Sequence, residues 1–574
     1  MGTRARQPTQ GWVRVFAAAC TVVAAAACTP APRLVDTPVT SPSQDKPVDT
    51  GEVVVGVTDM AGGFNPHEIA DQSPLTTALA NLVLPSVFRT GPDGTPQLDP
   101  TLMVSADVTK ADPYTVTYRI RADASWSDAA PIAAEDFVYL WDRMIAEPGT
   151  IDAAGYRLIS DIAAQDGGKS VEVTFSQPYP GWRTLFSGLL PAHLVKDAPG
   201  GWPAALQNSF PAAGGPYAVK TLDRDRGEIV LERNDRYWEQ PATLDRLIMR
   251  LGEQDGLVDA LDAGHDQLAV APTDSVGQNL LTGLGDTVSV QTVPRPAVTS
   301  VLLRPGSAKL AEQPVRQAIM ALLDRAQLIT VGTGNGPAAG LRADAQVLAP
   351  SMPGYAASGP PGGAEPTELL DQAGYTKTDG AWTANGEPVR LVIGAAAERP
   401  VDERLAQEVA RQLTAAGFTT EVVTPTGAEL FAGLFTPAPD GTSGSDDSGD
   451  GDGQQAVDIA IAAQPVGGDP ATTLATNFGC AKDEQGRTGT AGANPMGFCD
   501  TGLQPTIDAA LNGSLPLAEA LPTIEPALWR SAVVLPLYQQ ADSLAVRPEM
   551  TGVTIGPPLS GPFAGAPFWR RAAG

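Results

Sequence analysis

The segment 389–423 restricts the fold more than any other part of the sequence. Val389–Gly394 is a short apolar run typical of a buried strand, and Phe418–Val423 is a second one. The residues between them, 403–416, place apolar side chains at helical spacing, and Gly417 supplies a stop signal. A strand, a helix and a strand in this order form a crossover unit with parallel strands. We therefore expect the second half of the chain to be α/β.

Other segments continue the alternation of strands and helices. The 574 residues are enough for two or three domains with sizeable cores. One helix is expected to begin at Ser73, with Ser as its N-cap and Pro74 in the first turn. Further strands are predicted at 52–57, 115–120 and 457–462, and an amphipathic helix at 134–146.

The first residues have the pattern of an export signal. A basic start with Arg4, Arg6 and Arg14 precedes the mostly apolar run Val15–Ala27. The 13 residues of that run are too few to span a bilayer. The run ends in Ala25–Ala27 directly before Cys28, an arrangement that resembles the bacterial lipobox and predicts lipidation of Cys28. The rival interpretation is a plain secretory peptide that is cleaved nearby.

The segments 29–51 and 437–455 are predicted to lie outside the folded body. The first is rich in Pro, Ser and Thr and reads as a tether that follows the signal peptide, 1–28. The second is rich in Asp, Gly and Ser and reads as a disordered acidic insert. A calcium loop there would need an acidic residue at the position that Val457 occupies. No later stretch is long and apolar enough to predict a transmembrane helix.

Charge and residue usage exclude several function classes. The formal net charge of -27 repels phosphate backbones and argues against nucleic-acid binding. His67, His193 and His265 are isolated and show no metal-ligand spacing, so neither a metal nor a cofactor is expected. The sequence lacks the nucleophile-elbow, zinc-protease, P-loop and dinucleotide signatures, which argues against an enzyme. In an exported protein, Cys480 and Cys499 are expected to pair with each other.

Several spaced motifs together resemble family 5 of the extracellular solute-binding proteins, the dipeptide, oligopeptide and nickel-binding group. The first is YRIRADASWSDAAPIAAEDFVYLWDRM at Tyr118–Met144. The others are Gly215–Tyr217 with Leu231–Trp238, Val315–Ile319 with Asp324–Arg325, and the weaker Leu369–Tyr375 and Val533–Tyr538.

The resemblance implies a type II periplasmic-binding-protein fold with two α/β lobes, an extra subdomain and a hinge cleft. The implied boundaries are 52–83, 213–300 and 543–574 for lobe I, 84–212 for the extra subdomain and 301–542 for lobe II. The ligand then lies in the cleft, and closure is a hinge motion.

A closer likeness, to a mycobacterial group of envelope lipoproteins, implies a role in the synthesis of phosphatidylinositol mannosides, lipomannan and lipoarabinomannan. It is carried by Gly63–His67, Asp99–Thr109, Gln177–Gly201 and Cys499–Gly513. The implied partners are the membrane on the outer face, through the anchor, a mannosylated phosphatidylinositol and a membrane mannosyltransferase. The alternative is an importer subunit that delivers peptides or another small solute to an ABC permease.

The segment Val466–Asp469 departs from the peptide-binding members of the family. If Pro470 is the shared proline, Val466 stands where those members carry the Asp that meets a peptide ammonium, and Asp469 replaces it only if the loop is shifted by three residues. Gly467 and Gly468 leave backbone N–H groups accessible to a phosphate, or they only make a turn. Phe64, Asn65 and Pro66 are expected to face this segment across the cleft.

Overall fold

The computed structural model describes residues 51–60, 62–360, 362–363, 365–435, 456–482, 488–490 and 494–572. The predicted signal peptide with Cys28, nearly all of the tether and the acidic insert lie outside these residues. In the part of the chain that is described, no helix combines the length and the apolar character needed to cross a bilayer.

Ten strands form one mixed sheet. They are β1 (Glu52–Val57), β8 (Tyr217–Asp223), β9 (Glu228–Arg233), β10 (Arg246–Leu251), β11 (Leu268–Ala271), β12 (Ser289–Leu303), β16 (Arg390–Ala395), β17 (Thr419–Val423), β18 (Ile459–Pro465) and β21 (Val534–Val546). Their order is β17-β16-β18-β12-β21-β11-β1-β10-β9-β8. β16 runs parallel to β17 and β18, and β1 runs parallel to β10 and β11.

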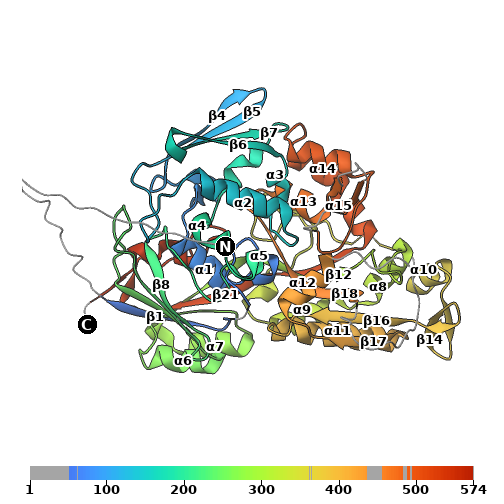
Figure 1. Ribbon diagram of the computed structural model, residues 1–574. Helices are drawn as coiled ribbons and strands as arrows, with labels where there is room; N and C mark the ends of the chain where they lie inside the picture. The colour runs from blue at the N-terminus through green and yellow to red at the C-terminus, as the bar shows by residue number, and fades with distance from the viewer. Residues whose placement is uncertain are drawn as a thin grey trace, which may run out of the picture. The chain divides into compact units, whose positions relative to one another are not determined.

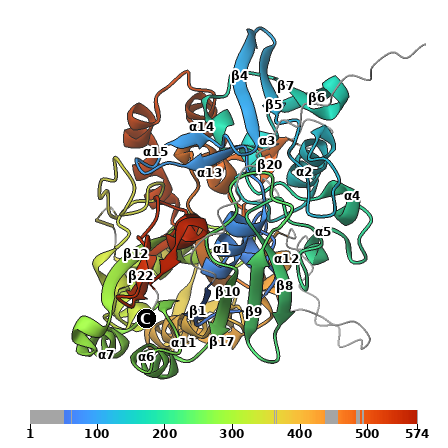
Figure 2. The same ribbon diagram turned by 90° about the vertical axis from the view of Figure 1, so that its left-hand side faces the viewer.

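A second sheet belongs to the predicted extra subdomain. It has the order β4-β5-β7-β6, with β4 (Met103–Ala111), β5 (Tyr114–Ile120), β6 (Ile159–Gln165) and β7 (Ser170–Phe175). Figures 1 and 2 show it at the top, away from the main sheet at the bottom. The remaining short strands are β2 (Phe88–Thr90), β3 (Pro96–Leu98), β13 (Thr376–Thr378), β14 (Ala381–Ala384), β15 (Glu387–Pro388), β19 (Cys480–Lys482), β20 (Thr488–Thr490), β22 (Met550–Thr551) and β23 (Arg570–Arg571).

The helices surround these sheets. They are α1 (Pro74–Val83), α2 (Ala134–Ala146), α3 (Ala153–Tyr156), α4 (Ala192–Val195), α5 (Gly201–Ala204), α6 (Gln254–Asp262), α7 (Ser275–Gly283), α8 (Gln313–Leu322), α9 (Arg325–Thr333), α10 (Pro366–Gln372), α11 (Pro400–Ala416), α12 (Gly427–Phe435), α13 (Pro470–Phe478), α14 (Gln504–Leu511) and α15 (Leu517–Ser531). Short 3₁₀ turns occupy Ile69–Asp71, Asp166–Gly168, Pro180–Thr184, Gly285–Thr287, Pro337–Gly340 and Pro562–Phe568.

The predicted α/β class is confirmed, with small corrections at the ends of elements. The helix α2 has the predicted bounds, and Ser73 caps α1 by accepting a hydrogen bond from the Thr76 N–H. The helix α11 begins at Pro400, three residues before its predicted start, because proline is well tolerated in a first turn. It ends at Gly417, whose φ of 110° is the left-handed stop that was expected.

The two halves of the main sheet are joined by β12 and β21, which are 15 and 13 residues long and antiparallel to each other. In the lobe II half, alternate side chains enter different cores. Val301 and Ile461 pack with α8, α9 and α11, whereas Leu302 and Ala460 belong to the core that continues into α13 and the extra subdomain. In this half, each face of the sheet is therefore covered by its own set of helices (Figure 1).

Candidate functional site

Cavities open on both sides of the paired strands β12 and β21. Arg295 of β12 lines the larger one, of about 880 Å³, and its neighbour Pro296 lines a second one, of about 260 Å³. The lining of the larger cavity includes Tyr538 and Ala541, which belong to the core under α8, α9 and α11, whereas that of the second includes Phe88 and Ile151, which belong to the core of the extra subdomain. The two cavities therefore lie on opposite faces of the hinge strands. The sequence-predicted cleft residues belong to the smaller cavity, which we call the groove.

The groove brings four of the predicted residues together. Pro66, which follows β1, and Val466, Gly467 and Gly468, which follow β18, all line it. The position of Val466 is apolar: this side chain is 8% exposed and packs in one cluster with Val298, Ala343 and Ala349. No carboxylate therefore projects from the end of β18 at this point.

The other three predicted residues have structural contacts. Phe64 is 1% exposed, and its ring lies 6.3 Å from that of Phe210. Asn65 is also buried, and its side-chain oxygen accepts the N–H of His67 at 3.1 Å. Asp469 caps α13, where its carboxylate accepts from the N–H and the hydroxyl of Thr472. None of these three side chains lines the groove.

A carboxylate that the sequence did not point to lies beside Gly467. Asp152, at the start of α3, accepts a hydrogen bond of 3.0 Å from the hydroxyl of Thr473 on α13. A Cβ atom on Gly467 would overlap this carboxylate, so glycine allows the close approach. Burial raises the pKa of Asp152 to about 6, the Thr473 bond opposes that rise, and Asp469 adds to it. Because this carboxylate accepts hydrogen bonds and repels anions, the site at Gly467 favours a hydroxyl donor over a phosphate.

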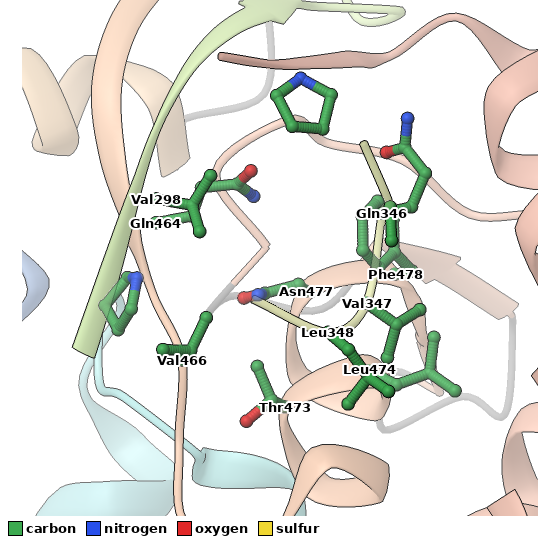
Figure 3. A pocket seen from close by; sticks show the side chains of 13 residues that line it. Val298, Gln346, Val347, Leu348, Gln464, Val466, Thr473, Leu474, Asn477 and Phe478 are labelled. Carbon is green, nitrogen blue, oxygen red and sulfur yellow. The ribbon is translucent and has the colours of Figure 1, made fainter. Parts of the chain in front are cut away.

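A smaller pocket adjoins Val466 on the lobe II side. Figure 3 shows Val466 and Thr473 on one side of it and the amide of Gln346 on the other. Its volume of about 20 Å³ is close to the space needed by one water molecule. We therefore exclude it as a site for an organic ligand.

The large cavity is lined by loops and helix ends from both predicted lobes. Lobe I contributes residues that follow β1 and β11, and lobe II contributes the end of α9 and residues 398–404 at the start of α11. Residues 398–404 follow β16 at its carboxyl end, where open α/β sheets place their ligands. The charged side chains of the lining are Asp59, Arg224, Asp274, Arg295, Glu398, Arg399, Asp402 and Arg404.

The arginines of this cavity differ in how their charges are balanced. Arg295 forms a buried ion pair with Asp542, with its Nε atom 2.7 Å from a carboxylate oxygen. Arg224 donates to the carbonyl oxygens of Met60 and Gln207, and Arg399 donates to that of Gln72. Within the described ranges, Arg224, Arg399 and Arg404 form no ion pair, so their positive charges are not neutralised by direct contact.

Asp402 is the one deeply buried acid of the lining without a bonded partner among the residues that the structure describes. Its side chain is 4% exposed, and its two oxygen atoms accept no hydrogen bond from those residues. Burial raises its pKa to about 6, while Arg399 lowers the pKa and Asp59 raises it further. A buried acceptor of this kind retains its capacity to bind a donor.

The cysteines and one of the histidines that the sequence singled out have structural roles. Cys480 and Cys499 are joined by a disulfide, with 4.9 Å between their Cα atoms, directly after α13. His67 is buried, and burial lowers its pKa to about 4 while its ring bonds to the carbonyl oxygen of Gly188. Over the described ranges, no three His, Cys, Asp or Glu side chains gather in a way that suits a metal ion.

Sequence comparison places most of the chain in a known family. Residues 97–483 match the profile of bacterial extracellular solute-binding proteins, family 5, middle region. A Mycobacterium tuberculosis protein named "Probable monoacyl phosphatidylinositol tetramannoside-binding protein LpqW" is 34% identical, over 94% of each chain. The oligopeptide-binding protein OppA of Mycobacterium bovis is 28% identical over 48% of each chain.

Solved structures show the same fold. A periplasmic EDTA-binding protein, EppA, has a TM-score of 0.70 at 22% identity and covers 94% of this chain and 100% of its own. The oligopeptide-binding protein AppA of Bacillus subtilis, in complex with a nonapeptide, has a TM-score of 0.71 at 16% identity and covers 92% and 100%. These likenesses confirm the expected periplasmic-binding-protein fold.

Proposed function

The chain belongs to the family 5 extracellular solute-binding proteins, and from this premise we propose that it binds a mannosylated phosphatidylinositol at the outer face of the cell membrane. In this role it regulates or presents intermediates in the synthesis of phosphatidylinositol mannosides, lipomannan and lipoarabinomannan. Its partners are then the membrane, the glycolipid and a membrane mannosyltransferase. It acts by binding and not by catalysis, in keeping with a family of binding proteins.

The extent of likeness supports the glycolipid over a peptide. The relative whose name includes phosphatidylinositol tetramannoside binding matches 94% of this chain, whereas the oligopeptide-binding relative matches 48%. A likeness that extends over both lobes covers the whole cleft, and ligand contacts come from both of its walls.

The observation that carries the proposal is the charge arrangement of the large cavity. A phosphatidylinositol headgroup is anionic, and Arg224, Arg399 and Arg404 are cations without an ion-paired partner in the described part of the chain. A peptide would in addition need a carboxylate for its ammonium, because an unpaired buried charge costs several kcal/mol. The large cavity offers Asp402 for this purpose, from a different element than the one that carries the carboxylate in the peptide-binding members. At the family position for that group the chain has Val466, within an apolar cluster.

The proposed attachment to the membrane rests on Cys28. Export followed by lipidation is favoured by three features: the arginine-rich start, the short apolar run and the alanines before the cysteine. Wild-type protein should then partition into detergent, and Cys28→Ala should release the protein or stall its processing. Normal processing together with membrane retention of the variant would contradict the anchor.

Delivery of peptides or another small solute to an ABC permease is the second candidate, and one observation favours it. Asp152 brings a carboxylate from the extra subdomain to Gly467, next to the place where peptide-binding members carry theirs. The ammonium group of a peptide placed there would be neutralised by the Asp152 carboxylate. This carboxylate already accepts the Thr473 hydroxyl and has a raised pKa, which makes it a weaker anchor.

Native mass spectrometry of the protein purified from its own host separates the candidates. We expect a retained ligand whose mass corresponds to an acylated, mannosylated phosphatidylinositol. The same protein after delipidation should bind that glycolipid again in calorimetry and should ignore a library of di- to pentapeptides. Micromolar peptide binding that is lost when the peptide N-terminus is blocked would establish the importer role instead.

A further inference from the structure

The start of α11 presents an acid and a cation to the large cavity, and neither has a hydrogen-bond or ion-pair partner among the described residues. Asp402 is the third residue of this helix and Arg404 is the fifth. Side chains two positions apart leave a helix on opposite sides. Because both line the same cavity, that cavity must surround the N-terminal end of the helix.

Asp402 is the more informative of the two side chains. A residue that only favours the helix dipole is normally solvated, since the first turn of a helix tolerates an acid at the surface. Asp402 is instead 4% exposed and accepts no hydrogen bond from the residues that the structure describes. Buried carboxylates nearly always have donors. The cavity is the direction from which donors can reach this one.

Arg404 supplies a positive charge at the same end of the helix, where Asp402 supplies a hydrogen-bond acceptor. It is exposed toward the cavity and, within the described ranges, forms neither an ion pair nor a hydrogen bond. Its planar guanidinium matches the geometry of a phosphate or a carboxylate. Arg224 and Arg399 add positive charge to the same lining but donate to backbone carbonyl groups.

We propose that the start of α11 is the headgroup-reading site, where Arg404 binds the phosphate of a polyol phosphate and Asp402 accepts hydrogen bonds from its sugar or inositol hydroxyl groups. This assignment rests on the proposed function and deepens it by giving the two chemical halves of the headgroup to two residues. Asp402 and Arg404 are binding residues in this account, and no bond is made or broken.

The volume and the neighbouring acids agree with a large polar headgroup. The cavity has about 880 Å³, near the upper end of the range for small-molecule sites. The acids Glu398 and Asp274 are already engaged, Glu398 with the Gly427 N–H and Asp274 with the Gly277 N–H at the start of α7. They therefore compete little with Asp402 for the hydroxyl groups of the ligand.

Calorimetry with soluble probes tests the assignment. The probes are the deacylated headgroup, glycerophosphoinositol tetramannoside, and a mannotetraose that lacks the phosphate. Arg404→Gln should weaken binding of the headgroup by roughly 10- to 100-fold, the effect of losing a charge-assisted hydrogen bond, and should leave mannotetraose binding within about twofold. Asp402→Asn should weaken binding of both probes.

Matched controls come from the same helix. Arg411→Gln removes the same charge at an exposed ion pair with Glu408, and Glu403→Gln changes a neighbouring acid; neither residue lines the cavity. Both controls should bind as the wild type does, and circular dichroism with a thermal melt should show that all four variants fold.

The possible outcomes separate the inference from the function on which it rests. If the wild type binds the headgroup and both Arg404→Gln and Asp402→Asn bind it equally well, the site assignment is wrong while the proposed function stands. If the wild type binds no headgroup, the function fails and the assignment fails with it. If free peptides bind and this binding is lost in Asp402→Asn, the ligand of the cavity is a zwitterion, and the proposal of a polyol phosphate is wrong.

Discussion

The groove beside Gly467 and the large cavity at the start of α11 lie on opposite faces of the hinge strands, and they treat charge differently. In the groove, Asp152 accepts from Thr473, Arg89 is paired with Asp99, and Arg183 stacks on Trp182. In the large cavity, Arg404 and Asp402 lack partners among the described residues.

The difference indicates a division of labour between the two faces. A charged side chain that is already bonded to another part of the chain stabilises the fold. If its partner is removed, the remaining buried charge is left without a hydrogen bond or counter-charge, which is energetically costly. Unpartnered charges have their hydrogen-bonding capacity left for a ligand. We therefore infer that the charged residues of the groove mainly stabilise the fold and that those of the large cavity mainly bind the ligand. Arg295, in its buried pair with Asp542, is the clearest structural exception within the large cavity, where Glu398 and Asp274 also accept backbone N–H groups.

The largest effect on stability is expected at that exception. Arg295→Met would leave the carboxylate of Asp542, which is 3% exposed, without its cation. Breaking a buried pair from one side costs about 3–5 kcal/mol in the free energy of unfolding. Urea unfolding should show this loss, and the double variant Arg295→Met/Asp542→Leu should recover most of it. A single variant as stable as the wild type would mean that this pair is not structural.

The disulfide that follows α13 should give the next largest effect. Cys480→Ser/Cys499→Ser is expected to lose about 3 kcal/mol, since a closed loop of this length restricts the unfolded chain. Peptide mapping without reductant should recover the two cysteines in one linked peptide. Reductant should lower the melting temperature of the wild type and not that of the variant. Two free thiols in the exported protein would rule out this contribution.

Gly467→Ala tests the cohesion of the groove itself. The added methyl group would meet the carboxylate of Asp152 and the hydroxyl of Thr473. Such overpacking costs about 1–3 kcal/mol. The control is Gly433→Ala, in α12, where a Cβ atom meets nothing and helix propensity improves. Equal thermal stability of the Gly467 variant and the wild type would show that Asp152 does not hold the subdomain to α13.

The last prediction concerns the pH dependence of stability at Asp402. The folded-state pKa of Asp402 is about 6, above the ordinary 3.8, so the native state binds this proton more tightly than the unfolded chain. Its contribution to stability is therefore present below pH 4 and is lost as the pH rises through 6. Asp402→Asn should therefore become more stable relative to the wild type as the pH rises from 4 to 7.5. A difference independent of pH would contradict the burial of this acid.

The sequence predicted the elements whose signals are local. The apolar stripe of Ala134–Ala146 and the glycine stop at Gly417 are read within one helix, and both agree with the structure. The long strand β12 escaped prediction because Pro294 and Pro296 interrupt its pattern, as prolines do in an ordinary strand.

The site depended on contacts between distant segments. Asp152 and Gly467 meet only through the packing of the extra subdomain on α13, which no local pattern encodes. Asp402 resembled an ordinary first-turn acid until its burial was known. One signal was available: the charged run 398–404 follows a predicted parallel strand at its carboxyl end, where such sheets bind ligands.

A crystal structure of the protein with a phosphorothioate analogue of the deacylated headgroup would test the central claim most directly, because the sulfur marks the phosphate position by its anomalous signal. We predict the sulfur peak in the large cavity, within hydrogen-bond distance of the Arg404 guanidinium, with ring hydroxyl groups against Asp402. A peak in the groove beside Gly467 and Asp152, with the large cavity empty, would contradict the division of labour between the two faces.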